Sequence, residues 1–280
     1  MTDITEESTS RYLVVDGIRI HYNEMGTGYP VICLHGAGPG ASSWSNFKQN
    51  VDALSQHYHL YLVDMPQYGK SDKIVFQEGR LTFVARILAN LMKQLGIERA
   101  HFIGNSMGGQ TAIKLAIDRP DLVDHLVTIG GVPMFFSIMQ PMLTEGVKMI
   151  REYYMAEPGP TPQKMRKLIE TFVYDASFLT DELVHERYQA SIDPKVIEIF
   201  SSYQTHPRNE DLSAEFHRLK AKTLIVWGND DRFAPLDCGL FLLRRAQNAR
   251  MHVFGQCGHW AQVEHADEFN RLVLDFFASS

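Results

Sequence analysis

The sequence predicts an α/β fold with a mostly parallel central sheet, flanked by helices and interrupted by an inserted helical segment. Short apolar runs of strand length alternate with stretches of helical spacing, and Gly or Pro follows most of these runs. Apolar runs of this kind are typical of strands buried on both faces of a parallel sheet. The alternation stops after residue 131 and resumes near residue 219. We therefore expect residues 1–131 and 219–280 to form one core, and residues 132–218 to form a helical lid.

The elements of the core follow in chain order. Alternation of apolar and polar residues over positions 12–24, around Asp16-Gly17, predicts an antiparallel hairpin. Buried strands are predicted at residues 31–34, 60–63, 101–103, 126–129, 223–227 and 251–254. Helices are predicted over residues 44–54, from about 107, over 236–246 and over 262–277. Between the two halves of the core, helical spacing in the lid is interrupted by Pro158, Pro160, Pro162 and Pro207.

The composition argues against several classes of protein. A formal net charge of -6 without a basic cluster speaks against a nucleic-acid partner. The three cysteines lie far apart and form no C-x-x-C pair, so neither a disulfide framework nor a zinc site is expected. The first ten residues lack the features of a secretory signal, and no stretch reaches membrane-spanning length. We expect a cytoplasmic protein without a membrane partner.

A nucleophile motif follows the strand predicted at residues 101–103. Gly104-Asn105-Ser106-Met107-Gly108 is a G-x-S-x-G sequence between a short apolar strand and a helix, which is the context of a nucleophile elbow. The tight turn leaves no room for side chains next to the serine, which explains the glycines. The alternative is a strand-to-helix turn that only happens to contain serine. The motif therefore makes Ser106 the candidate nucleophile.

A serine hydroxyl needs a base, and the base needs an acid that fixes its tautomer. Asp231 follows the strand predicted at residues 223–227, and His259 follows the next strand. The order Ser, Asp, His is that of the α/β-hydrolase fold, which puts all three at the carboxyl ends of strands. Asp230 is the alternative acid, and His265 is the nearest alternative base. The sequence favours Ser106, Asp231 and His259 as a catalytic triad.

The loop after the first parallel strand, His35-Gly36-Ala37-Gly38-Pro39-Gly40, can supply an oxyanion hole. Developing negative charge must be met by pre-aimed N–H groups, and the backbone of Ala37 and Met107 can provide them. The same loop matches the dinucleotide pattern G-x-G-x-x-A. That alternative fails on context because the first acid after the next strand, Asp64, is badly spaced for a ribose.

Four strings carry a resemblance to a known family. They are HGAGPGASSWSNF (35–47), GNSMGG (104–109), GNDDRFAP (228–235) and CGHWAQVEH (257–265). They closely resemble the meta-cleavage product hydrolases, and the likeness spans nearly the whole chain. The resemblance implies hydrolysis of a carbon–carbon bond in a 2-hydroxy-6-oxohexa-2,4-dienoate-type product of aromatic ring cleavage. The products would be a 2-hydroxypenta-2,4-dienoate and a carboxylic acid, and no metal or organic cofactor is expected.

The resemblance also implies which side chains bind the substrate. They are Gly38, Asn46, Asn105, Ser177, Arg187 and Trp260. An arginine suits this site because a guanidinium fork holds a planar carboxylate well in a water-poor cleft. The alternative for Arg187 is a surface pair with Glu182 or Glu186. An apolar cluster that opens the lid fits either a hydrophobic substrate tail or a lid-to-core packing seam, and comprises Phe135, Phe136, Met139 and Met142.

Two departures from the family pattern stand out. Ala37 replaces a common glycine, which is tolerable because only its N–H is needed, whereas Gln67 replaces a glycine for no reason visible in the sequence. Two other functions fit the same scaffold: a carboxylesterase or lactonase, and a ligand-binding receptor that keeps the pocket without turnover. The resemblance also makes self-association of the chain an expectation.

Overall fold

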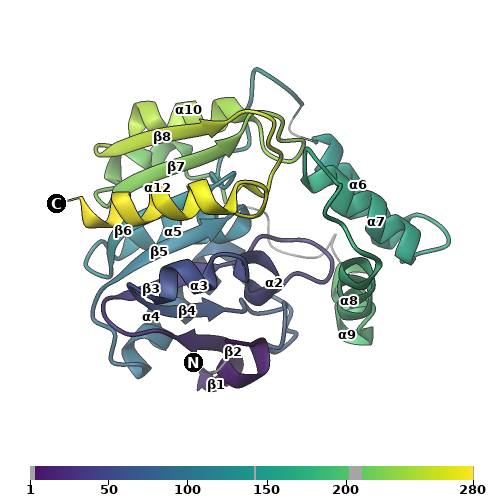
Figure 1. Ribbon diagram of the computed structural model, residues 1–280, viewed down its shortest axis with the longest axis horizontal. Coiled ribbons are helices and arrows are strands. Elements are labelled where there is room, and N and C mark those ends of the chain that lie inside the picture. Colours follow the sequence, from purple (N-terminus) through teal and green to yellow (C-terminus); the bar gives the residue numbers. More distant parts are fainter. Residues whose placement is uncertain (1–3, 142, 202–209, 280) are drawn as a thin grey trace.

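The computed structural model describes residues 4–141, 143–201 and 210–279. Within these residues, eight strands form one sheet in the order β1-β2-β4-β3-β5-β6-β7-β8 (Figure 1). The pairs β1·β2 and β2·β4 are antiparallel, and all other pairs are parallel. The strands are β1 (Ser10–Val15), β2 (Ile18–Met25), β3 (Pro30–Leu34), β4 (His59–Val63), β5 (Ala100–Asn105), β6 (Val123–Ile129), β7 (Lys222–Gly228) and β8 (Ala249–Phe254). The prediction of a mostly parallel sheet is confirmed.

The opening hairpin is also as predicted. Asp16 and Gly17 join β1 to β2 with φ values of 52° and 80°. Two consecutive residues with positive φ are what the two-residue turn of a twisted hairpin requires, and Asp-Gly is a preferred pair for it. The hairpin forms one edge of the sheet.

Helices cover both faces of the sheet. Side chains alternate along β3: Ile32 and Leu34 enter one apolar core, and Val31 and Cys33 enter the other. The first core lies under α4 (Arg80–Gln94), α5 (Met107–Asp118) and α10 (Leu236–Arg245), and the second under α2 (Ser43–Phe47), α3 (Val51–Ser55) and α12 (Ala266–Ala278). Figure 1 shows α2, α3 and α12 on the same side of the sheet.

Two helices expected as continuous are each broken in two, and the short α1 (Glu6–Thr9) and one longer helix were not expected. The helix predicted over residues 44–54 is α2 and α3, and the one predicted over 262–277 is α11 (Ala261–Glu264) and α12. The buried amide of Asn50, between α2 and α3, donates to the Gln262 carbonyl and to Asn270 Oδ1. The side chain of Asn50 therefore links the break between α2 and α3 to α11 and α12, the two halves of the other broken helix. The longer unexpected helix is α4, whose apolar face is buried against the core.

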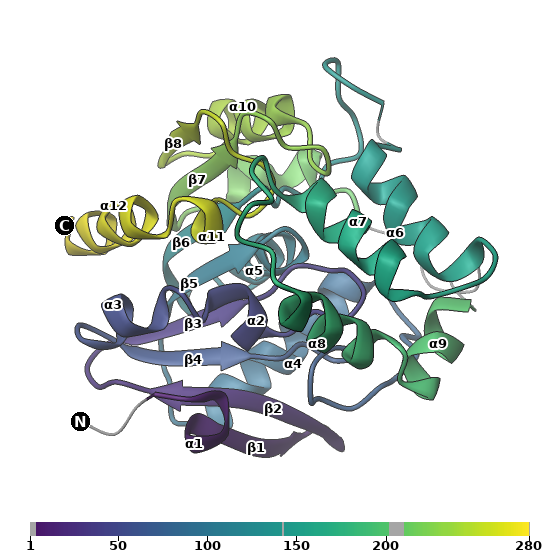
Figure 2. The same ribbon diagram turned by 45° about the vertical axis from the view of Figure 1, so that its right-hand side comes forward.

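The segment between β6 and β7 stands at the carboxyl-terminal edge of the parallel strands (Figures 1 and 2). It contains α6 (Glu145–Met155), α7 (Pro162–Phe172), α8 (Asp181–Ser191), α9 (Pro194–Ser201) and the short 3-10 helix Ser213–Arg218. Its apolar cluster includes Phe172 and Met165 and is completed by Phe233 and Trp260 from the core. In the described residues, no helix is both long and apolar enough to cross a bilayer.

The structure explains why Gln67 stands where the family pattern has glycine. Gln67 has a φ of 80°, in the region that favours glycine. Its buried side chain donates from Nε2 to the carbonyl of Ile74 at 2.7 Å, and its N–H donates to the carbonyl of Asp72. The side-chain hydrogen bond compensates for part of the backbone strain.

We expect Gln67→Ala to lower the free energy of unfolding by about 1 kcal/mol, because the strain stays and a buried hydrogen bond is lost. Gln67→Gly loses the same hydrogen bond but relieves the strain, so its stability should lie between those of Gln67→Ala and the unsubstituted protein. Urea unfolding midpoints of the three proteins test this order. A glycine variant less stable than the alanine variant would contradict it.

Candidate active site

Ser106 lies in the sharp turn between β5 and α5. Its backbone is strained, with φ 50° and ψ -116°, as a nucleophile elbow requires. A Cβ at Gly104 would lie 2.4 Å from backbone atoms of the following turn, and one at Gly108 would lie 2.2 Å from the Leu34 carbonyl oxygen. Only glycine fits at either position. The glycines of the G-x-S-x-G motif are therefore required by steric contacts, as expected from the sequence.

His259 and Asp231 form a buried pair. Nδ1 of His259 lies 2.7 Å from Oδ2 of Asp231, and both side chains are 2% exposed. The other carboxylate oxygen of Asp231 accepts the N–H groups of Phe233 and Ala234, at 2.7 and 2.9 Å. These bonds fix the carboxylate so that Oδ2 accepts a hydrogen bond from the Nδ1–H group of His259. The proton is thereby kept on Nδ1, which leaves Nε2 free to act as a base.

Backbone contacts bring Ser106 next to this pair. The amide of Asn105 donates to the carbonyl oxygens of His259 and Ile129, both at 3.2 Å. A Cβ at Gly130 would lie 2.9 Å from His259 Nδ1, and one at Gly131 would lie 2.2 Å from the Ser106 carbonyl oxygen. Gly130 therefore lies against His259, and Gly131 lies against the backbone of Ser106, with no room for a side chain at either position. The sequence shows them as a Gly-Gly doublet, but their role was not predicted.

The rival acid and base lie elsewhere. Asp230 is exposed, and within the described residues its carboxylate accepts one long hydrogen bond, from the Cys257 N–H. His265 stands between α11 and α12, where its ring stacks on Phe254 and its Nε2 lies 3.5 Å from the Gln256 carbonyl. Neither side chain reaches the other members of the predicted triad.

The loop after β3 lies against Ser106. A Cβ at Gly36 would be 3.3 Å from the Ser106 Cβ. Oδ1 of Asn46 accepts the Gly36 N–H at 3.1 Å. His35, fully buried, bonds the Gly36 carbonyl through Nδ1 and accepts the Met65 N–H at Nε2. These partners put the proton on Nδ1, and burial lowers the pKa of His35, so the ring is a neutral brace for the loop.

The oxyanion-hole candidates fit this arrangement. Met107 opens α5, where first-turn N–H groups have no acceptor within the helix. Ala37 is in the braced loop, one residue after Gly36. Asn46, which the family resemblance puts in the substrate pocket, uses its side-chain carbonyl oxygen to position this loop. Asn105 likewise uses its amide on the backbone around Ser106, while its buried Oδ1 has no hydrogen-bond partner in the described residues.

Asp64 has a structural role, which removes the basis for dinucleotide binding. Its buried carboxylate bonds Nδ1 of His21 and accepts the N–H groups of Ser43 and Lys70, all within 2.9 Å. Burial alone would raise the pKa of this carboxyl, but the histidines and these hydrogen bonds lower it overall. With its oxygens engaged in this way, Asp64 has little capacity left to bind a ribose.

Arg187 is the most unusual side chain of the site. It lies on α8, is only 5% exposed, and is the one buried Lys or Arg of the described residues. Its Nε is buried without a hydrogen-bond partner, and no carboxylate of the described ranges pairs with it. Burial lowers its pKa to about 10, so it stays charged at neutral pH. The alternative of a surface pair with Glu182 or Glu186 is therefore wrong.

The guanidinium of Arg187 faces the loop after β3 (residues 35–40), which we call the oxyanion loop, and it packs against two aromatic rings. A Cβ at Gly38 would lie 3.4 Å from Nη2 of Arg187. The Arg187 guanidinium carbon lies 4.9 Å from the Trp260 ring centre and 5.6 Å from that of Phe172. These two rings stack at 4.5 Å, and the Phe172 carbonyl accepts the His259 N–H. Phe172 was not predicted, because nothing in α7 marks it apart from other core residues.

The structure does not bring Ser177 to the other predicted site residues. Its side chain is exposed, and both its hydroxyl and its N–H bond the carboxylate of Asp175 at 2.8 Å. A serine commonly closes a local turn in this way. The apolar cluster at the start of the lid forms no packing seam: Phe135, Phe136 and Met139 are 39%, 63% and 60% exposed. Met142 lies outside the described residues.

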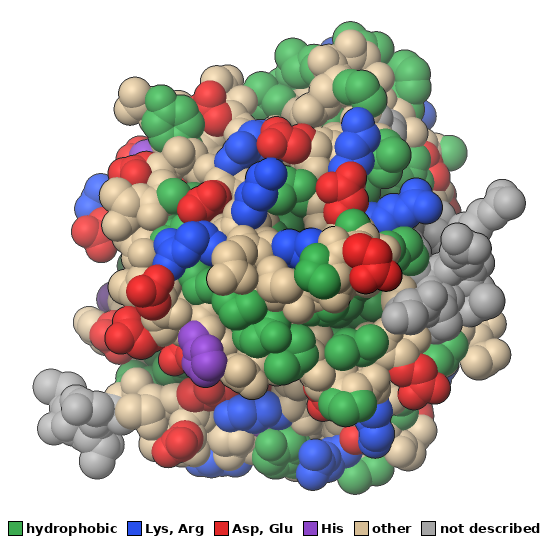
Figure 3. Space-filling view, turned by 90° about the vertical axis from the view of Figure 1, so that its right-hand side faces the viewer, with side chains coloured by type: hydrophobic (Ala, Val, Ile, Leu, Met, Phe, Trp, Pro, Cys, Tyr) green, Lys and Arg blue, Asp and Glu red, His purple; other side chains and the backbone are tan. Residues whose placement is uncertain are grey.

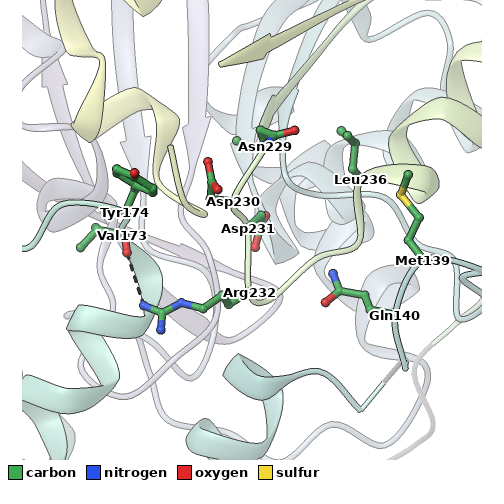
Figure 4. Close-up of a pocket in the computed structure, with 10 residues that line it drawn as sticks. Met139, Gln140, Val173, Tyr174, Asn229, Asp230, Asp231, Arg232 and Leu236 are labelled. Atoms are coloured by element: carbon green, nitrogen blue, oxygen red, sulfur yellow. Dashed lines mark hydrogen bonds between the residues drawn. The ribbon is translucent and has the colours of Figure 1, made fainter. Parts of the chain in front are cut away.

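A cavity of 610 Å³ lies beside Asp231 (Figure 4). Residues from the start of the lid, from the segment after α7 and from the loop after β7 line it, including Met139, Tyr174 and Arg232. Asp231 is also among its lining residues, whereas Ser106, His259 and Arg187 are not. On the lid face, acidic and basic side chains are interspersed above a hydrophobic band, and no single basic patch appears (Figure 3).

Comparisons with known proteins agree with this geometry. The family model described as alpha/beta hydrolase fold matches residues 29–266. The chain is 44% identical to a 2-hydroxy-6-oxononadienedioate/2-hydroxy-6-oxononatrienedioate hydrolase of Burkholderia vietnamiensis, and the match covers 99% of each protein. It is also 44% identical to a 2-hydroxy-6-oxo-6-phenylhexa-2,4-dienoate hydrolase of Comamonas testosteroni, with the same coverage.

A solved structure extends the match to three dimensions. A mutant of the meta-cleavage product hydrolase CumD from Pseudomonas fluorescens IP01, complexed with acetates, superposes with a TM-score of 0.86 at 36% identity, covering 95% of this chain and 97% of the other. The chain therefore belongs to the α/β-hydrolase fold family and, within it, to the meta-cleavage product hydrolases.

Proposed function

We propose that this protein hydrolyses a carbon–carbon bond in an anionic 2-hydroxy-6-oxohexa-2,4-dienoate, with Arg187 binding the carboxylate next to the 2-hydroxyl group. The observation that carries the proposal is the buried guanidinium without an acidic partner. A buried charge is costly unless it is paired. An anionic substrate would supply the missing partner.

The order of steps follows from the substrate. The dienol has no bond ready to break until a proton reaches C5, which gives a 2,6-diketone. We assign the proton transfers to His259, general acid–base work that typically contributes about 10² to 10⁴ in rate. Arg187 holds the carboxylate end during this step. Its forked geometry and the aromatic rings beneath it fix the orientation of the chain.

Cleavage then uses the elbow and the oxyanion loop. Ser106 Oγ attacks the C6 carbonyl and gives its proton to His259, while the N–H groups of Ala37 and Met107 stabilise the oxyanion. Collapse breaks the C5–C6 bond and releases a dienolate, which takes a proton to become the 2-hydroxypenta-2,4-dienoate. Water activated by His259 frees the carboxylic acid from Ser106. Direct attack by water is the competing path, with Ser106 only orienting the substrate.

We expect Arg187→Gln to lower kcat/KM for 2-hydroxy-6-oxo-6-phenylhexa-2,4-dienoate about 100-fold, equivalent to about 2.7 kcal/mol, because charged hydrogen bonds to the carboxylate are lost. Turnover of the neutral ester 4-nitrophenyl acetate should stay within about threefold. Arg187→Lys keeps the positive charge but lacks the forked guanidinium. Its kcat/KM for the dienoate should lie between those of Arg187→Gln and the unsubstituted protein. Loss of the dienolate colour and release of nitrophenol measure the two reactions.

Arg166→Gln is the matched control. Arg166 is a lid arginine on α7 that pairs with Asp181 at the surface, so its removal should change neither reaction. If Arg187→Gln slowed both substrates equally, the arginine would be structural and carboxylate binding would be excluded. Ester turnover without dienoate turnover in the unsubstituted protein would favour a carboxylesterase, and silence with both substrates would favour a receptor.

We also propose the cytoplasm as the compartment, a small molecule as the only required partner, and self-association of the chain. The two nearly equally similar relatives act, by their names, on dienoates with different tails, so the tail is not part of the proposal. Turnover of the phenyl and the dicarboxylate compounds, compared side by side, would identify it.

A further inference from the structure

A second cluster of side chains that can bind metal ions lies near the amino-terminal ends of β5 and β6. Ser106 follows the opposite, carboxyl-terminal end of β5. The cluster consists of His101 at the start of β5, and Asp124 and His125 at the start of β6. One ligand atom from each lies within 4.8 Å of the others. Ser106 follows His101 by five positions along the extended chain of β5, or about 16 Å. The cluster is therefore remote from the hydrolytic site.

The register of β5 and β6 shifts at the cluster, as it does at a β-bulge. Ala100 pairs with Val123 and Phe102 with Leu126, so one residue of β5 faces two residues of β6. Neighbouring side chains of a regular strand point to opposite faces, and a bulge re-aims one of them. Here it allows both Asp124 and His125 to approach His101. Bulges between parallel strands are rare, which makes this irregularity informative.

Both imidazoles turn a buried, unpartnered nitrogen toward one carboxylate oxygen. Nδ1 of His101 and Nδ1 of His125 have no hydrogen-bond partner in the described residues. They lie 3.5 and 3.4 Å from the same atom, Oδ2 of Asp124. The side chains of His101 and His125 are only 6% and 9% exposed. Such nitrogens are costly to bury unless something binds them.

The tautomer of His125 leaves a lone pair facing Asp124. Nε2 of His125 lies 3.3 Å from the carbonyl oxygen of Ser279, which can only accept, so Nε2 carries a proton. In this tautomer Nδ1 of His125 has a lone pair and lies 3.4 Å from Oδ2 of Asp124. A lone pair and a carboxylate oxygen in contact repel each other unless a proton or a metal ion lies between them.

We propose that His101, Asp124 and His125 bind a divalent transition-metal ion, with Zn²⁺ as the best fit. Ligand atoms about 2.0–2.1 Å from a tetrahedral zinc are about 3.4 Å apart, close to the two nitrogen–oxygen distances seen here. The bond from His125 to the Ser279 carbonyl is the outer contact that metal-ligating histidines commonly make. The ion would join β5 to β6 and has no part in the hydrolysis.

The donor set and its charges select the ion. Two imidazoles with one carboxylate suit Zn²⁺, Ni²⁺ or Cu²⁺ better than Mg²⁺ or Ca²⁺, which prefer oxygen ligands. Arg99 pairs with the other oxygen of Asp124 at 3.0 Å, and its positive charge opposes a cation. Asp124 is 27% exposed, which leaves a path for the ion and for a water as fourth ligand.

The test is zinc titration of the full chain, prepared without a histidine tag and stripped with a chelator. We expect one equivalent of Zn²⁺ by calorimetry, and a thermal midpoint raised by about 5 °C when free Zn²⁺ is 100 times Kd. Co²⁺ in its place should give the visible absorption of a four-coordinate site. Asp124→Asn and His125→Gln should each weaken binding at least tenfold and leave the hydrolase activity unchanged.

Arg99→Gln separates metal binding from loss of the ion pair. It removes the same Arg99–Asp124 pair as Asp124→Asn but keeps all three ligands, so it should bind Zn²⁺ at least as tightly as the unsubstituted chain. His252→Gln, on β8, is a control for nonspecific histidine binding and should change nothing. Absence of a bound equivalent, or equal binding by Asp124→Asn, would overturn the proposal. Zinc that binds only with loss of hydrolase activity would place the ion at His259 and overturn it as well.

Discussion

Ser106→Ala is expected to lower kcat for the phenyl dienoate by about 10⁴-fold. The substitution removes the one hydroxyl held in the strained turn between β5 and α5, next to the oxyanion loop. The oxyanion donors and the substrate contacts remain, so a residual rate above the uncatalysed reaction should persist. Stopped-flow absorbance on the dienolate, with the released acid measured separately, tests this expectation.

The same variant distinguishes the two hydrolytic paths. Because His259 and Arg187 are untouched, proton transfer to C5 should still occur, and the dienolate colour should decay without release of acid. Mass spectrometry of the unsubstituted protein, quenched during turnover, should show an acyl group on Ser106. Near-normal acid release by Ser106→Ala would rule out the nucleophilic role. Ser177→Ala, an exposed serine turned toward Asp175, should match the unsubstituted protein.

Asp231→Asn is expected to reduce kcat about 10⁴-fold while leaving the fold intact, an effect of the size known for this change in other triads. Oδ1 of Asp231 accepts two backbone N–H groups, and an asparagine oxygen would keep these bonds. Its NH₂ group would then face Nδ1 of His259 and force the proton onto Nε2. The imidazole could no longer accept the proton of Ser106.

Asp230→Asn is the matched control, because this neighbouring carboxylate is exposed and does not contact His259. The kcat of Asp230→Asn should stay within about twofold of that of the unsubstituted protein. Comparison of kcat with thermal midpoints for both variants separates a catalytic effect from a folding effect. Equal losses in the two variants would mean that Asp231 does not orient His259.

Local sequence patterns were enough to predict the mostly parallel sheet and to name the candidate triad. Buried parallel strands must be continuously apolar, and the turns that end them need Gly or Pro, so each strand is visible in local composition. The elbow is equally local, because only glycine fits at positions 104 and 108. Because the fold puts the acid and the base in loops after later strands, only a few residues qualify once Ser106 is identified. Asp231 and His259 are the candidates in those loops.

Which polar side chains are buried depends instead on how distant segments pack together. Arg187 and Ser177 lie ten residues apart in a polar stretch, yet one is buried and the other is exposed. Their burial depends on how α8 packs against the loop after β3, a contact between segments about 150 residues apart. The cluster of His101, Asp124 and His125 likewise depends on a one-residue slip between two strands. Local composition records neither feature, because both arise from the packing of segments distant in the chain.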